Sequence, residues 1–98
     1  MKMTTFGELR NILSRIDRLS ICDRNTTKYR NFLRIEDVPE RYDSLYVCGI
    51  GMAQSEFYRI NEFEYSVKEG EGQLVLAPCI EVVTTKKKPE RQSEKWED

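Results

Sequence analysis

Apolar residues recur with two different spacings along this chain, and the change between them limits the folds that it can adopt. In the first stretch they recur every three or four residues, which is the period of one face of an amphipathic helix. The residues concerned are Phe6, Leu9, Leu13 and Ile16. Thr5 and Glu8 have the spacing of a capping box, in which each side chain bonds the backbone N–H of the other. We therefore predict a helix from Thr5 to Ile16.

Beyond Ile16 the apolar residues alternate or form short runs, as they do in strands. The predicted strands cover residues 18–23, 28–35, 44–50, 63–67 and 73–85. Asp37 or Pro39 can open a single helical turn after the second strand. Gly49 and Gly51 indicate a bulge or the end of the third strand, and Pro78 divides the last strand or places it at an edge.

Residues 52–62 fit either a helix or a loop that enters a strand at Phe57. With that alternative open, we expect an α+β fold in which the N-terminal helix packs on a four- or five-stranded antiparallel sheet. Residues 1–85 would form this single domain. Residues 86–98, of which nine are charged, would form a disordered charged C-terminal tail. Trp96 within the tail is either a docking anchor or a bystander.

The absence of histidine excludes Ser-His-Asp and Cys-His catalysis and every metal site that uses imidazole. Cys22, Cys48 and Cys79 are odd in number and far apart, so we expect reduced thiols buried in strands rather than a zinc site. No other motif selects a catalytic pair. We expect no enzyme activity, no cofactor and no metal. Neither a signal peptide nor a membrane-spanning stretch is found, so we expect a cytoplasmic protein without a membrane partner.

The net charge of −1 hides an uneven distribution of charge. Residues 1–42 carry a net charge of +3, residues 43–85 carry −5, and the remaining residues carry +1. The acidic part contains four carboxylates that either imitate nucleic-acid phosphates toward a basic protein or are ordinary solvated side chains. These are Glu62, Glu64, Glu69 and Glu71.

The predicted hairpin over residues 18–35 concentrates positive charge. Its core-facing residues would be Leu19, Ile21, Tyr29, Leu33 and Ile35. Because side chains alternate across a strand, the remaining residues would face solvent together. This face would carry the candidate partner-binding residues Arg18, Arg24, Lys28, Arg30, Phe32 and Arg34. Such a surface can dock an acidic protein, bind a single nucleic-acid strand by stacking and phosphate pairing, or only keep the sheet soluble.

The order of these segments resembles a known group of proteins. A capped helix precedes two strands, then the stretch Ile35–Glu40, an apolar third strand, and a short final strand at 74–76 before a charged tail. As a pattern, this order is similar to small uncharacterised proteins carried by bacterial phages, plasmids and other mobile elements. The resemblance implies a non-enzymatic binder, and this group includes inhibitors of host defence nucleases such as anti-CRISPR proteins.

We therefore expect a small protein-binding module that acts by occlusion, as an inhibitor of a nuclease or nucleoprotein complex does. The alternative is a small single-stranded nucleic-acid-binding protein that uses the basic hairpin. A free sheet edge would also allow a homodimer, which leaves the oligomeric state open.

Overall fold

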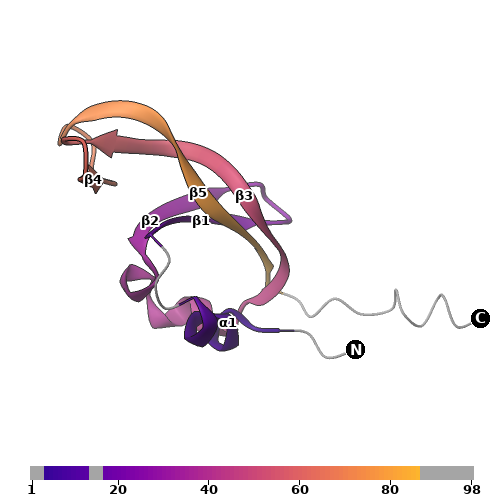
Figure 1. Cartoon of the computed structure of the whole chain (residues 1–98). Helices are drawn as coiled ribbons and strands as arrows, with labels where there is room; N and C mark the ends of the chain where they lie inside the picture. The colour runs from indigo at the N-terminus through magenta and orange to yellow at the C-terminus, as the bar shows by residue number, and fades with distance from the viewer. Residues whose placement is uncertain (1–3, 14–16, 87–98) are drawn as a thin grey trace, which may run out of the picture.

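The computed structural model describes residues 4–13 and 17–86. Within them the chain forms one α-helix, two short 3-10 helices and five strands. Their bounds are α1 (Phe6–Ile12), β1 (Asp17–Asp23), β2 (Tyr29–Arg34), η1 (Ile35–Asp37), η2 (Glu40–Ser44), β3 (Tyr46–Arg59), β4 (Tyr65–Ser66) and β5 (Gln73–Thr85). The helix and the 3-10 helices lie together below the β1–β2 hairpin, and β3 and β5 arch away from it (Figure 1).

The five strands form one mixed sheet in the order β2-β1-β5-β3-β4. Neighbouring strands are antiparallel except β1 and β5, which run parallel with Leu19 opposite Ile80 and Ile21 opposite Val82. The α+β class is confirmed, but the expectation of a purely antiparallel sheet was wrong. The segment containing η1 and η2 returns the chain, so β3 runs in the same direction as β2. The turn into β5 then reverses the chain once more, which makes β5 parallel to β1.

The N-terminal helix has the predicted capping box. The Thr5 hydroxyl accepts the Glu8 N–H at 3.3 Å, and the Thr5 N–H donates to the Glu8 carboxylate at 3.1 Å. Phe6 and Leu9 are buried, whereas Ile12 lies on the exposed side of the helix. The helix ends at Ile12, earlier than predicted, and residues 14–16 of the prediction lie outside the described residues.

The main core lies between α1, the 3-10 helices and one face of the sheet. Its buried residues are Phe6, Leu9, Leu19, Ile21, Phe32, Ile35, Val38 and Val82. Phe32 is only 8% exposed, so the prediction that its ring faces solvent is wrong. The strand register explains the error, because Phe32 lies directly opposite Leu19 and opposite residues share a face.

Tyr29 and Leu33 therefore point to the other face of β2, contrary to the sequence interpretation. Leu33 packs against a second core formed by Phe57, Ala77 and Cys79. Tyr29 is an exposed side chain at the end of the strand. Because both faces of β2 carry apolar residues, its alternation alone did not identify the face that contacts the helix.

β3 and β5 extend beyond β1 as a long two-stranded arm, which we define as residues 52–59 and 73–79. β3 continues to Arg59, so neither of the two alternatives for residues 52–62 is correct over its full length. The predicted bulge is present between Val47 and Gly49. At the far end of the arm, Gly72 lies so close to the Arg59 carbonyl that a Cβ atom would collide with it.

The arm packs over the second face of β2. The Asn31 amide donates to the Glu56 carbonyl at 2.7 Å and accepts the Ser55 hydroxyl at 3.1 Å. The Tyr29 hydroxyl donates to the Glu56 carboxylate at 3.3 Å. These bonds hold the arm over the β1–β2 hairpin, which consequently lies between two apolar clusters.

Arg10 fixes the position of the two 3-10 helices relative to α1. Its guanidinium donates to the Asp43 carboxylate at 2.9 and 2.5 Å, to the Ile35 carbonyl at 3.0 Å and to the Pro39 carbonyl at 3.1 Å. One planar fork thus joins three elements. The single helical turn predicted to open at Asp37 or Pro39 is present as η2, which follows Pro39, whereas η1 was not predicted.

Two sequence predictions concern parts of the chain that are not described. The disordered tail falls on residues 87–98 apart from Lys86, and Trp96 lies in the same segment. In the described residues, no helix has both the length and the apolar character needed to span a membrane.

Candidate functional site

The six predicted partner-binding residues do not share one surface. Lys28 and Arg30 line a cavity at the turn end of the β1–β2 hairpin. Arg18 and Arg34 line a smaller hollow of about 170 Å³ at the other end of the hairpin. Arg24 belongs to neither, and the sixth residue is the buried Phe32. The prediction of a single basic face with a stacking ring at its centre is therefore wrong.

Local interactions also divide these arginines. The Arg18 guanidinium donates to the Pro78 carbonyl at 2.9 Å and lies 4.5 Å from the centre of the Tyr65 ring, so it faces the arm. Arg18 has a φ of 58°, which interrupts regular alternation at the start of β1. Arg34 lies 3.8 Å from Glu36 in an exposed ion pair.

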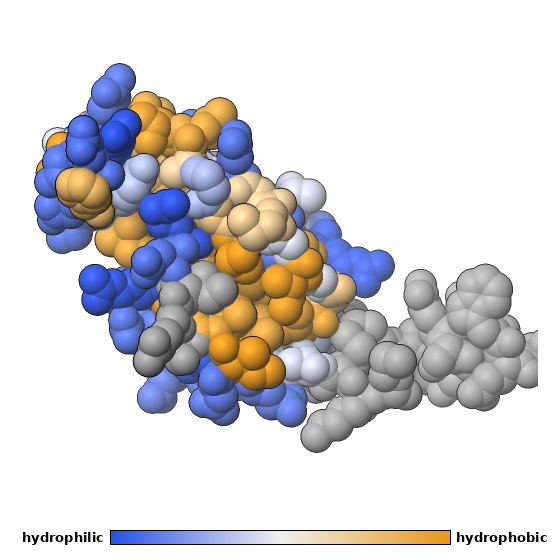
Figure 2. Space-filling view, viewed as in Figure 1, coloured by the Kyte–Doolittle hydropathy of each residue, from blue (hydrophilic) through white to orange (hydrophobic). Residues whose placement is uncertain are grey.

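An exposed apolar strip follows the β3–β5 hairpin. Directly opposite residues in antiparallel strands share a face, as do alternate residues along one strand. The register therefore places six apolar residues together, namely Leu74, Leu76, Pro78 and Ile80 from β5 and Ile50 and Met52 from β3. Met52 is 75% exposed and Leu76 is 66% exposed. In Figure 2, apolar atoms follow the course of this hairpin between patches of hydrophilic atoms.

The strip begins at the main core and runs into solvent. Val82, the next residue of this face along β5, is fully buried against the helix. From Ile80 to Leu74 the same row leaves the cover of α1, over a length of about 20 Å. Large contiguous patches of exposed apolar side chains are uncommon on monomeric proteins.

The outer part of the β3–β5 hairpin is acidic. Residues 52–73 carry five glutamates against one arginine and one lysine, which gives the segment a net charge of −3. Glu56 shares the face of the strip, directly opposite Leu76. The tip between β3 and β4 adds Phe63, which is 91% exposed. The arm thus presents apolar groups in an acidic setting.

Comparisons with known proteins do not identify a family for this chain. No family model, curated protein or solved structure matches the chain.

The three cysteines form no disulfide, and all are buried or half-buried. Cys79 is buried in the second core, and Cys22 and Cys48 are half-buried. Burial raises the pKa of the Cys79 thiol, and the nearby Glu81 carboxylate raises it further, whereas Arg18 lowers it. A raised pKa disfavours the thiolate and makes Cys79 a poor nucleophile. Among the described residues, no group of cysteine and carboxylate side chains is placed to hold a metal ion.

The sequence interpretation missed two surfaces. The apolar strip was hidden because residues 52–62 were not identified as a strand, so the alternation of Ile50 and Met52 was not extended. The cavity at the hairpin turn was hidden because Arg41 and Lys86, which line it with Arg30, come from distant parts of the chain. In the sequence, the net charge of −5 over residues 43–85 indicated the acidic character of the β3–β5 hairpin, and no charge pattern indicated the cavity.

Proposed function

We propose that this protein is a non-catalytic binding module that docks another protein against the apolar strip. The observation that carries the proposal is the row of exposed apolar side chains on one face of β3 and β5, with Met52 and Leu76 the most exposed. Interface centres are enriched in methionine and in large apolar side chains that lose their water on binding. The lack of histidine in the chain supports a non-catalytic role.

The partner that fits this surface has an apolar patch next to lysine or arginine side chains. The segment 52–73 is acidic, and Glu56, whose carboxylate accepts the Tyr29 hydroxyl, lies opposite Leu76. Opposite charges across an interface speed association and exclude wrong partners. A second copy of the chain fits less well, because a two-fold contact through the strip would bring the same carboxylates together.

A finer proposal follows from this charge. Nucleases and nucleoprotein complexes expose basic surfaces that bind nucleic-acid phosphates. An acidic arm with an apolar centre can cover such a surface and exclude the nucleic acid. We therefore propose a stoichiometric inhibitor of a host defence nuclease, in agreement with the group of mobile-element proteins that the sequence resembles. The basic hairpin of the sequence interpretation is not required for this mode of binding.

The first experiment identifies the partner and then tests the surface. The protein is used as bait in extracts of its native host, and the captured partner is purified and titrated by calorimetry. Met52→Ser and Leu76→Ser should each weaken the complex by about tenfold or more, as loss of an interface anchor does. Both side chains are exposed, so the melting temperature should stay unchanged.

Ile12→Ser is the matched control. Ile12 is as exposed as Met52, at 75%, but lies on α1 outside the strip. Its substitution should leave affinity unchanged. Equal losses in Met52→Ser and Ile12→Ser, or none in either, would contradict docking at the strip. Sedimentation should show a monomer, and a dimer abolished by Met52→Ser would show that a second copy covers the strip instead.

Inhibition is tested with a nuclease recovered as partner. Cleavage should fall linearly with added protein and stop near one equivalent, and Met52→Ser should shift the curve to higher concentration. A stable complex with full nuclease activity would contradict occlusion and leave only the docking proposal standing.

A further inference from the structure

A cavity of about 370 Å³ opens beside the turn of the β1–β2 hairpin. It is bounded by β1, β2, η2 and the end of β5, and shares no residue with the apolar strip. Cavities of this size hold small-molecule ligands in other proteins. The cavity is therefore a second candidate site, independent of the docking surface proposed above.

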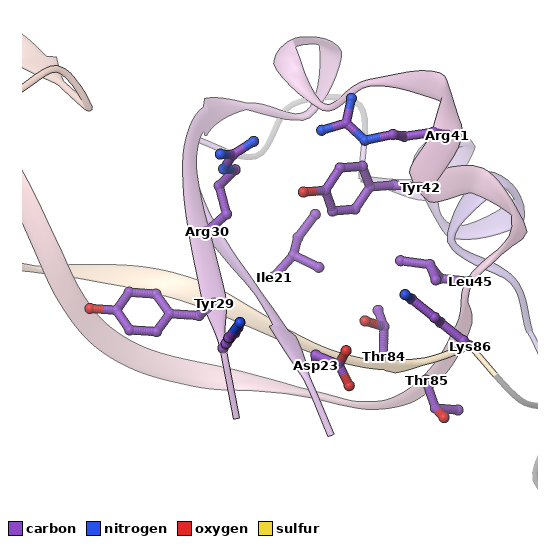
Figure 3. A pocket seen from close by; sticks show the side chains of 11 residues that line it. Ile21, Asp23, Tyr29, Arg30, Arg41, Tyr42, Leu45, Thr84, Thr85 and Lys86 are labelled. Atoms are coloured by element: carbon purple, nitrogen blue, oxygen red, sulfur yellow. The ribbon is translucent and has the colours of Figure 1, made fainter. Parts of the chain in front are cut away.

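Positive charge converges on the cavity from three separate parts of the fold. Lys28 and Arg30 come from the β1–β2 hairpin, Arg41 from η2 and Lys86 from the end of β5. In Figure 3 the Arg30 and Arg41 guanidinium groups lie on the side of the Tyr42 hydroxyl, and the Lys86 amine points inward from the opposite side. The one acidic lining residue, Asp23, already accepts the Asn25 N–H at 2.8 Å.

Among the described residues, neither Arg30 nor Arg41 forms a hydrogen bond or an ion pair through its guanidinium group. The Arg41 guanidinium lies over the ring of Tyr42, 5.3 Å from its centre. By contrast, the guanidinium groups of Arg10, Arg18 and Arg59 all donate to oxygen atoms of the protein. Each guanidinium carries five donors in a planar fork that matches phosphate oxygens. The guanidinium groups of Arg30 and Arg41 are thus available to donate hydrogen bonds to an anion.

The floor of the cavity is apolar. Ile21 and Leu45 contribute aliphatic groups, and Tyr42 contributes a ring that forms a T-shaped pair with Phe32, with the centroids 5.7 Å apart. The Tyr42 hydroxyl points into the open space near Arg30 (Figure 3). A bare inorganic anion would leave this floor unused. The lining fits a ligand that combines phosphate groups with an apolar ring.

We propose that this cavity binds a nucleoside phosphate. Arg30 and Arg41 hold the phosphate oxygens by charge-assisted hydrogen bonds, Lys86 adds a third cation, and the base lies against Ile21, Leu45 and Tyr42. The same chemistry occurs in a free nucleotide and in the 5′-phosphorylated end of a nucleic-acid strand. The site goes beyond the proposed docking function and does not depend on it.

The test is a calorimetric titration of the full chain at low ionic strength. The probes are ADP, UDP, pyrophosphate, and one oligonucleotide with either a 5′-phosphate or a 5′-hydroxyl. We expect a nucleoside diphosphate to bind at least tenfold more tightly than pyrophosphate. Arg30→Gln and Arg41→Gln should each weaken that binding about tenfold or more. Both side chains are exposed, so circular dichroism should show an unchanged fold.

Arg34→Gln is the matched control, because it removes the same charge from the same strand outside the cavity. It should change affinity by less than about twofold. Preference for the 5′-phosphorylated oligonucleotide over ADP would assign the ligand to a strand end, and the reverse to a free nucleotide.

Three results would overturn the proposal. The first is the absence of nucleotide binding up to about 1 mM. The second is pyrophosphate binding as tight as that of ADP and UDP, which would show that the apolar floor is not used. The third is an equal loss of affinity in Arg34→Gln, which would reduce the effect to general electrostatic attraction. Failure of this test leaves the docking proposal intact, since the two surfaces share no residue.

Discussion

Replacing Phe32 by alanine tests which face of β2 is buried. If Phe32 were a surface ring, as its position in the alternation suggests, the substitution would change stability little. In the structure it is 8% exposed and packs edge-on against Tyr42. Truncation of a buried phenylalanine costs about 3–5 kcal/mol, from lost burial and from the cavity that remains. A domain of this size has a total stability of roughly 5–15 kcal/mol, so the variant would lose a large part of it.

The measurement is urea denaturation followed by circular dichroism. With a slope of about 1–3 kcal/mol per M, the midpoint should fall by about 1–5 M. Phe32→Leu retains most of the volume and should cost only about 1–2 kcal/mol. Phe63→Ala is the control, because this ring is 91% exposed and its loss should cost less than about 0.5 kcal/mol. Equal midpoints for Phe32→Ala and Phe63→Ala would refute the assignment of the faces.

Three further predictions concern single contacts. Arg10→Ala removes a fork that joins three elements and should cost about 2 kcal/mol in the same urea assay, whereas Arg34→Ala, which breaks an exposed ion pair, should cost less than about 0.5 kcal/mol. Gly72→Ala places a Cβ atom against the Arg59 carbonyl of β3 and should lower the melting temperature by several degrees. An unchanged melting temperature would show that the backbone of the turn moves to accommodate the Cβ atom at little cost. The pKa of the Cys79 thiol is higher in the folded protein than in the unfolded chain, so the free energy of unfolding should decline as the pH rises above about 8.5. Iodoacetamide at pH 8 should label Cys79 more slowly than Cys22, as measured by mass spectrometry.

The features that the sequence predicted correctly depend on residues close together in the chain. Thr5 and Glu8 are three positions apart, and their capping box forms as expected. The hairpin turn at 23–27 is equally local. Each of these patterns has its own hydrogen-bonding solution, so distant residues change it little.

The errors arose where distant residues decide the outcome. The direction of β5 relative to β1 depends on the path through η1 and η2, which no local pattern encodes. β2 has apolar side chains on both faces, and only the register with Leu19 shows that Phe32 faces the helix. The proposed nucleotide cavity needs Arg30, Arg41 and Lys86 together, and these residues from β2, η2 and the end of β5 come close only in the folded chain.

The place of β5 in the sheet has a consequence for synthesis of the protein. This strand is the last element among the described residues, yet it lies between β1 and β3 and pairs with both. While residues 73–85 are still inside the ribosome, β1 and β3 cannot pair with β5, and Leu19 and Ile21 lack the β5 residues that they face in the sheet. The sheet should therefore form only late in synthesis and in one cooperative step. Until then, the emerging chain would be a substrate for chaperones that bind exposed apolar segments.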